Sequence, residues 1–142
     1  MPDDLAITDF PLRARDKLRY GDTDRQGHIN NAVFSTFLET GRVELIYGQA
    51  GRLAEPGTAF VLARLELDFR AELLWPGEVE IGTRVASVGR SSVRLQQAIF
   101  QGERCVASGV SVIVQMDEST RKARPFSDAV REQLERLAAP AA

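Results

Sequence analysis

The residues best suited to chemistry lie in one polar segment, Arg19 to Asn31, of this 142-residue chain. It contains two aspartates, Asp22 and Asp24, the only histidine, His28, and an asparagine pair that directly precedes the longest helical pattern. The first N–H groups of a helix have no partner within the helix, and its dipole places partial positive charge at that end. An anion that develops there during a reaction would be stabilised.

Composition and charge exclude several classes of function. The net charge is −2 with basic and acidic residues interspersed, so no electrostatic field favours nucleic acid or a membrane surface. Cys105 is the only cysteine and His28 the only histidine, which excludes an internal disulfide and makes a metal centre improbable. We therefore expect no metal and no bound cofactor.

The start of the chain, MPDDLAITDF, lacks the basic and apolar regions of a signal peptide. Nowhere do about 18 uncharged apolar residues follow one another, as a membrane-spanning helix would need. These two observations predict a cytoplasmic protein without a membrane partner.

The main helix is predicted from Ala32 to Tyr47, directly after the polar segment. Apolar residues recur there at steps of three and four, and either asparagine of the preceding pair can cap the helix start. Gly41 on the apolar face would permit the close approach of a sheet. Gly48 and Gly51 signal the end of the helix.

A first strand with one solvated face, formed by alternating side chains, is expected from Arg13 to Tyr20. After the Pro56-Gly57 turn, apolar and polar residues alternate in four extended segments joined by short turns. Short turns imply antiparallel neighbours, because parallel strands need crossovers of a dozen or more residues. The four segments centre on residues 61–69, 79–85, 93–99 and 106–114.

This order of elements predicts an α+β fold in which a curved antiparallel sheet of about five strands wraps around one long helix. A short amphipathic helix from Ser127 to Leu137, capped by Ser127, should follow the sheet. We expect a single domain, 1–142, because this length can bury one core and leaves little room for a second.

Both the order of elements and the polar segment resemble the hotdog-fold thioesterases, particularly bacterial acyl-CoA thioesterases of the 4-hydroxybenzoyl-CoA thioesterase type. The family signature is matched by RYGDTDRQGHINNAVFSTFLETGR, and its second strand, turn and next strand by LDFRAELLWPGEVEI. The resemblance covers nearly the whole chain and implies a hotdog fold.

Two departures from related sequences concern the same polar segment. The plant acyl-carrier-protein thioesterases carry aspartate, asparagine and histidine in the corresponding stretch; Asp24 and His28 match, whereas Gln26 replaces the asparagine. The benzoyl-type enzymes have bulkier apolar residues in place of His28, Ile29 and Asn30. The resemblance therefore does not imply an aromatic substrate.

The resemblance implies that Asp24 is the catalytic carboxylate and that a backbone N–H near Asn31 polarises a thioester carbonyl. The carboxylate could activate a water or attack the thioester carbon, or it could merely satisfy N–H groups of the loop. His28 either orients the substrate or the attacking water, or is a hydrogen-bonded scaffold residue. We assign Gly27 and Asn30 to substrate binding, although Asn30 can also cap the helix.

Asp22 is expected to be structural, because two carboxylates one residue apart would repel each other if both faced the substrate. Cys105 is expected to be a small buried side chain rather than a nucleophile. Coenzyme A carries phosphates that need donors, so we assign Arg90, Arg121 and Lys122 to substrate phosphates; the alternative is a solvated basic surface.

The sequence thus predicts hydrolysis of an acyl-CoA or acyl-carrier-protein thioester, with water as the second substrate. The resemblance also implies a homodimer or homotetramer whose sheets join and whose active sites lie at the subunit interface. A non-catalytic acyl-thioester binding module and a hydratase are alternatives, because a fold does not determine its chemistry.

Overall fold

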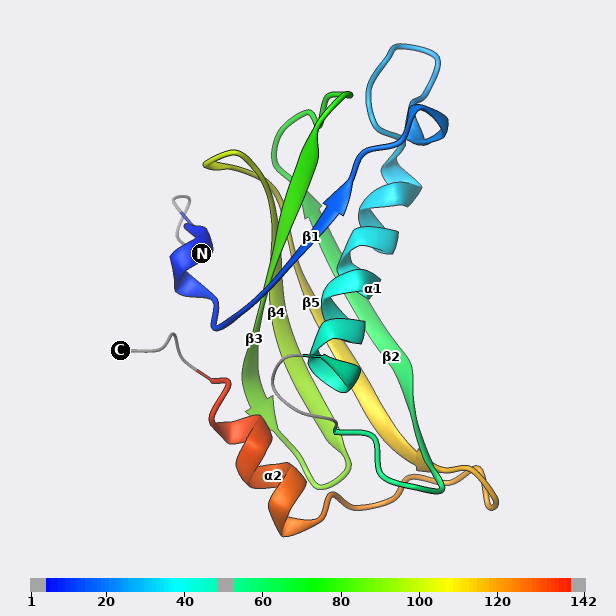
Figure 1. The fold of residues 1–142 in the computed structure, drawn as a ribbon. Coiled ribbons are helices and arrows are strands. Elements are labelled where there is room, and N and C mark those ends of the chain that lie inside the picture. Colours follow the sequence, from blue (N-terminus) through cyan, green and yellow to red (C-terminus); the bar gives the residue numbers. More distant parts are fainter. Residues whose placement is uncertain (1–4, 49–52, 139–142) are drawn as a thin grey trace.

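The computed structural model describes residues 5–48 and 53–138. A five-stranded antiparallel sheet curves around the helix α1 (Asn31–Tyr47), which confirms the predicted hotdog architecture (Figure 1). The order of strands across the sheet is β1-β3-β4-β5-β2. The strands are β1 (Leu12–Lys17), β2 (Thr58–Phe69), β3 (Glu78–Val88), β4 (Ser92–Gln101) and β5 (Arg104–Asp117).

The two edges of this sheet, β1 and β2, are consecutive strands joined through α1. The other three strands form a meander with the short turns expected from the sequence, whereas β2, which was expected to neighbour β3, pairs with β5 instead. As a result, the polar segment that precedes α1 lies where the first edge strand gives way to the helix, at the upper end of the molecule in Figure 1.

Asparagine and glycine set the ends of α1. The Asn30 side chain accepts a hydrogen bond from the Ala32 N–H at 3.0 Å, so the first asparagine of the pair is the cap. The helix ends at Tyr47 with Gly48 as its C-terminal cap. The second predicted stop signal, Gly51, lies outside the described residues.

Gly41 brings α1 close to the sheet, as predicted. A Cβ atom at this position would lie 2.6 Å from Gln97 Nε2 and 2.8 Å from Ile81 Cγ2, which is too close for any side chain. Gln97 Nε2 in turn donates to the Leu38 carbonyl and to Thr83 Oγ1, each at 3.0 Å. This buried amide ties the middle of the helix to β3 and β4.

The core beneath α1 has two main parts. The part near the end of the helix packs Leu45 and Leu95 against Val130 and Leu134 of the helix α2 (Asp128–Glu135). Ser127 Oγ accepts a hydrogen bond from the Val130 N–H, which confirms the predicted cap. The part near the start of the helix is made by Phe34, Phe37, Leu38, Ile29, Ile81 and Ile99, with further residues around them.

Two details of the strands differ from the prediction. The first strand ends at Lys17, and Tyr20, which was expected to continue it, lies 74% exposed in the short 3₁₀ helix Tyr20–Asp22. In β2 the pairing with β5 shifts between Leu62 and Arg64, so strict alternation does not hold along the whole strand.

Candidate active site

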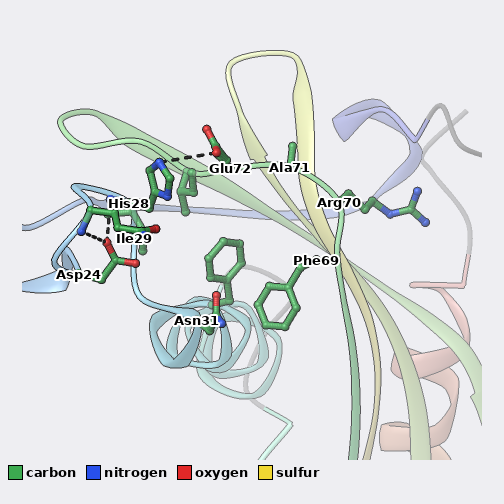
Figure 2. A pocket seen from close by; sticks show the side chains of 11 residues that line it. Asp24, His28, Ile29, Asn31, Phe69, Arg70, Ala71 and Glu72 are labelled. Carbon is green, nitrogen blue, oxygen red and sulfur yellow. Dashed lines mark hydrogen bonds and ion pairs between the residues drawn. The ribbon is translucent and has the colours of Figure 1, made fainter.

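A recess of about 480 Å³ opens at the start of α1, between the polar segment and the connection that follows β2 (Figure 2). We call it the Asp24 recess. It is lined by Asp24, Gln26, His28, Ile29, Asn31, Phe34, Phe69, Arg70, Ala71, Glu72 and Leu73.

Asp22 is a buried residue whose hydrogen bonds hold the polar segment in place. It is only 3% exposed; its carboxylate accepts hydrogen bonds from the Arg19 side chain, the shortest 2.7 Å, and from the Arg19 N–H. The hydrogen bond from the guanidinium holds the pKa of this carboxyl below its usual value. The Asp22 carbonyl also accepts from the Asn30 N–H, so the buried acid fixes both ends of the loop.

Gly27 allows the loop to turn back on itself. Its φ of +81° lies in the left-handed region that favours glycine, and its N–H donates to the Asp24 carbonyl at 3.1 Å. Gly27, assigned to substrate binding from the sequence, is not among the residues that line the recess. Its contacts are those of the turn.

This turn orients the Asp24 carboxylate. Asp24 Oδ1 accepts from the N–H groups of Gln26 at 2.9 Å and His28 at 3.1 Å. Within the described part of the chain no donor reaches the second oxygen, which points toward the side of the recess that holds Asn31 and Phe69 (Figure 2). One oxygen is therefore occupied by the loop, and the other is available to a substrate or a water.

The cap leaves one amide of the helix start available. The Asn30 side chain accepts from the Ala32 N–H, and the Asn30 backbone carbonyl accepts from the Val33 N–H at 2.9 Å. No acceptor for the Asn31 N–H is found among residues 5–48 and 53–138. An unpaired amide at the positive end of a helix is suited to hold a carbonyl oxygen that gains negative charge.

His28 lies on the side of the Asp24 recess opposite Asn31 and faces Glu72 (Figure 2). The distance between His28 Nε2 and Glu72 Oε1 is 3.6 Å. His28 forms an isolated antiparallel bridge with Leu74, and the Ile29 N–H donates to the Leu73 carbonyl. These contacts join two segments more than forty residues apart in the sequence. Glu72 was not singled out from the sequence, because only the folded pairing brings it to the site.

Phe69 is a second residue of the recess that the sequence did not reveal. Its ring meets Phe34 of α1 edge to face, with 5.1 Å between the ring centres. The alternation in β2 could not indicate that this end of the strand adjoins the polar segment. Together the two rings form the apolar wall of the recess.

The basic residues assigned to phosphates lie at the other end of the molecule. Arg90 is in the turn between β3 and β4, while Arg121 and Lys122 follow β5. Register places these turns beside the start of β2, whereas Phe69 ends that strand. At about 3.3 Å per residue the separation is roughly 35–40 Å. Within one protomer, therefore, these residues do not join the Asp24 recess.

Cys105 is half-buried at the start of β5, and its burial raises the pKa of the thiol. A raised pKa leaves less of the nucleophilic thiolate.

Among the described residues, no group of three or more histidine, cysteine or acidic side chains could hold a metal ion. In the same part of the chain, no helix has the length and apolar character needed to span a membrane.

Comparison with known proteins identifies the class. The sequence model of the thioesterase-like superfamily matches residues 18–134. The acyl-CoA thioester hydrolase YbgC of Escherichia coli O157:H7 is 26% identical over 102 residues, which cover 69% of this chain and 75% of YbgC. The family match spans most of the chain, so the chain belongs to the thioesterase-like superfamily and is a thioester hydrolase.

Solved structures agree with this assignment. A thioesterase from Thermus thermophilus, solved with coenzyme A and zinc, is 32% identical with a TM-score of 0.77; the match covers 90% of this chain and 94% of that one. The PA5185 protein of Pseudomonas aeruginosa PAO1 has a TM-score of 0.84 at 24% identity, over 96% and 98% of the two chains, and shows the fold alone.

Proposed function

We propose that the Asp24 recess hydrolyses an acyl-CoA thioester, with the Asn31 N–H holding the carbonyl oxygen and Asp24 supplying the reacting carboxylate. One observation carries this proposal. Judged by the described residues, a carboxylate with one unoccupied oxygen and an unpaired amide at a helix start line the same recess. This is the pair of groups that acyl transfer requires, one to attack or activate and one to stabilise the oxyanion.

Two routes are open to the Asp24 carboxylate. In the first it takes a proton from a water whose oxygen bonds to the thioester carbon; the C–S bond then breaks and the thiol leaves with a proton. In the second a carboxylate oxygen bonds to that carbon and expels the thiolate, and water hydrolyses the resulting anhydride. Both routes yield the free acid and the thiol.

We assign His28 a positioning role in either route. Its ring lines the Asp24 recess, and Glu72 faces its Nε2 at 3.6 Å. A histidine held in this way can orient the substrate or the attacking water. A scaffold role is the alternative. His28→Ala would then lower stability, and the kcat of the variant relative to wild type would be the same at every pH.

Coenzyme A is the proposed thiol because YbgC is named as an acyl-CoA thioester hydrolase and the Thermus thermophilus thioesterase was solved with coenzyme A. An acyl-carrier-protein thioester is the alternative substrate. A cytoplasmic location stays a prediction from the sequence.

The proposed enzyme is a homodimer, and the strand β2 supports this. Within the described residues β2 pairs only with β5, so its other edge is free. Beside that edge, large apolar side chains of β2 and α1 are about half exposed: Leu62, Phe69, Val43 and Tyr47. A second copy that pairs antiparallel along this edge would bury them and continue the sheet.

Such pairing would also give a role to the distant basic residues. The partner runs in the opposite direction, so its Arg90, Arg121 and Lys122 would approach this chain's Asp24 recess, where coenzyme A phosphates could meet them.

The proposed dimer is tested by measuring solution mass by light scattering for wild type and Leu62→Lys. We expect a dimer for wild type and dissociation for the variant; a fully active monomer would contradict the dimer.

The proposed chemistry is tested with Asp24→Asn, which keeps the size of the side chain and removes its charge. A positioned base or nucleophile of this kind typically contributes about 10²- to 10⁴-fold, so we expect kcat to fall by that factor. The matched control is Asp128→Asn, which removes an exposed carboxylate at α2. Thiol release from an acyl-CoA panel measures both; equal turnover by Asp24→Asn and wild type would exclude Asp24 from the reaction.

A single turnover in H₂¹⁸O detects the anhydride route if water attacks the anhydride at the enzyme's own carbonyl. Attack on an anhydride at the enzyme's carbonyl leaves ¹⁸O in the Asp24 peptide, as mass spectrometry can detect. The general-base route places all of the label in the acid product.

A further inference from the structure

Arg42 of α1 is a buried cation without a partner of its own. The residue is 8% exposed, and in the part of the chain that the structure describes no acceptor reaches its Nη1, which is itself buried. Burial lowers the pKa of the guanidinium, a shift that the nearby Glu39 carboxylate partly opposes. A buried charge is costly unless an opposite charge or an acceptor compensates it. The described protomer therefore leaves Arg42 in need of an acceptor.

The Arg42 side chain lines a small recess between α1 and β2, which we call the Arg42 recess. Its volume is about 210 Å³. Glu39 and Arg42 lie on its helix wall, and Phe60 and Leu62 lie on its strand wall. A carboxylate that enters this recess from outside would meet the guanidinium in apolar surroundings.

The exposed side of α1 continues the Arg42 recess as a stripe of residues. They recur at steps of three and four along the helix and are Ala32, Thr36, Glu39, Val43 and Tyr47. Val43 and Tyr47 are about half exposed, as is Leu62 at the adjoining edge of β2, and Figure 1 shows α1 running alongside β2. The stripe thus belongs to the apolar surface that the proposed dimer would bury, and Glu39 at its middle is its only charged residue.

A two-fold axis across the edge of β2 determines what meets this stripe. The axis reverses the partner, so the two α1 helices lie antiparallel, and every contact from one residue to another is repeated in the opposite sense. Glu39 and Arg42 are three residues apart and therefore lie close together on the helix surface. An axis that crosses the helices between these two positions sets each Glu39 opposite Arg42 of the other copy. The acid and the base are thus complementary to a second copy of the same pair.

We propose that the partner's Glu39 pairs with Arg42 across the dimer axis and completes the Arg42 recess. The proposal rests on the dimer proposed above. The carboxylate accepts hydrogen bonds from the guanidinium, while Val43, Tyr47 and Leu62 exclude water around the pair. In a separate chain the buried charge stays unpaired, so the ion pair favours the dimer and fixes the position of its axis.

Charge reversal in two separate chains tests this pairing. Glu39→Arg and Arg42→Glu each set like charges opposite one another in a homodimer, so we expect either dissociation constant to rise about 100-fold or more. An equimolar mixture of the two variants should form a heterodimer, because both of its cross-axis pairs join opposite charges. Light scattering measures the mass, and native mass spectrometry measures the composition. Glu135→Arg, which reverses an exposed acid of α2, is the control and should dimerise like wild type.

A second variant keeps the test open if circular dichroism shows that Arg42→Glu does not fold. Arg42→Met removes the charge and keeps a long flexible side chain in the buried position. If the two residues pair, Glu39→Gln should raise the dissociation constant about tenfold or more when Arg42 is present. In the Arg42→Met background the same change should have an effect of less than about twofold.

Three outcomes would overturn the ion pair: a Glu39→Arg variant that dimerises as tightly as wild type, a charge-reversed mixture that stays monomeric, or equal effects of Glu39→Gln in the two backgrounds. With a dimeric wild type, each of these outcomes removes the ion pair and leaves the dimer standing. A monomeric wild type would contradict the dimer and the ion pair together. Hydrolysis at the Asp24 recess is tested separately by Asp24→Asn.

Discussion

The two ends of α1 lie in contrasting surroundings. At its end, Leu45 is fully buried against Leu95 of the sheet and Leu134 of α2. At its start, Asn30 and Asn31 are exposed, and polar groups face an open recess. One helix therefore serves two purposes: its end holds the sheet and α2 together, while its start offers an unpaired amide to a ligand. Changes at the two ends should separate stability from activity.

The largest effect on stability is expected from Leu134→Ala at the buried end. Leu134 is fully buried in the core part that joins α2 to the sheet. Deleting such a side chain typically costs about 2–5 kcal/mol of unfolding free energy, because it leaves a cavity. Denaturant unfolding measures this loss, and kcat at 25 °C should stay near that of wild type.

The matched variant at the other end is Leu74→Ala, which removes a leucine that is 44% exposed. Surface substitutions usually change stability by less than about 0.5 kcal/mol. Equal losses in the two leucine variants would refute the contrast between the ends.

A smaller effect, confined to the start of α1, is expected from acid. The Arg19 guanidinium lowers the pKa of Asp22 in the folded state, so this carboxylate stabilises the fold at pH values above its unfolded pKa of about 3.9. That contribution is lost as pH falls through the lower folded pKa. Arg19→Met should reduce the pH dependence of stability below about pH 5. Unchanged pH dependence in this variant would remove Arg19 as the cause.

The fold could be predicted from the sequence because its signals are local. Periodicity gave the helix and the meander, Gly41 indicated a close approach, and Ser127 indicated the start of α2. Tyr20 was placed wrongly because alternation continued for three residues beyond the strand, into a turn that the Asp22 carboxylate holds by its hydrogen bonds to Arg19.

The site could be predicted only in part, because half of it comes from elsewhere in the chain. Asp24, His28 and Asn31 belong to one segment whose residue types point to chemistry. Glu72 and Phe69 reach the recess through pairing of that segment with the end of β2, and no local pattern encodes this contact. The arrangement of the distant basic residues depends on a second copy, which one chain cannot specify.

The bond between the Ile29 N–H and the Leu73 carbonyl has a consequence for inactivation. It belongs to a small set of contacts that fasten the loop bearing the acid to the opposite wall, apart from the strand pairings of the main sheet. Ile29 and Leu73 are also buried in the core part near the start of α1, so the two walls can separate only when that core opens. On heating, catalysis and the far-ultraviolet circular dichroism signal should therefore disappear together.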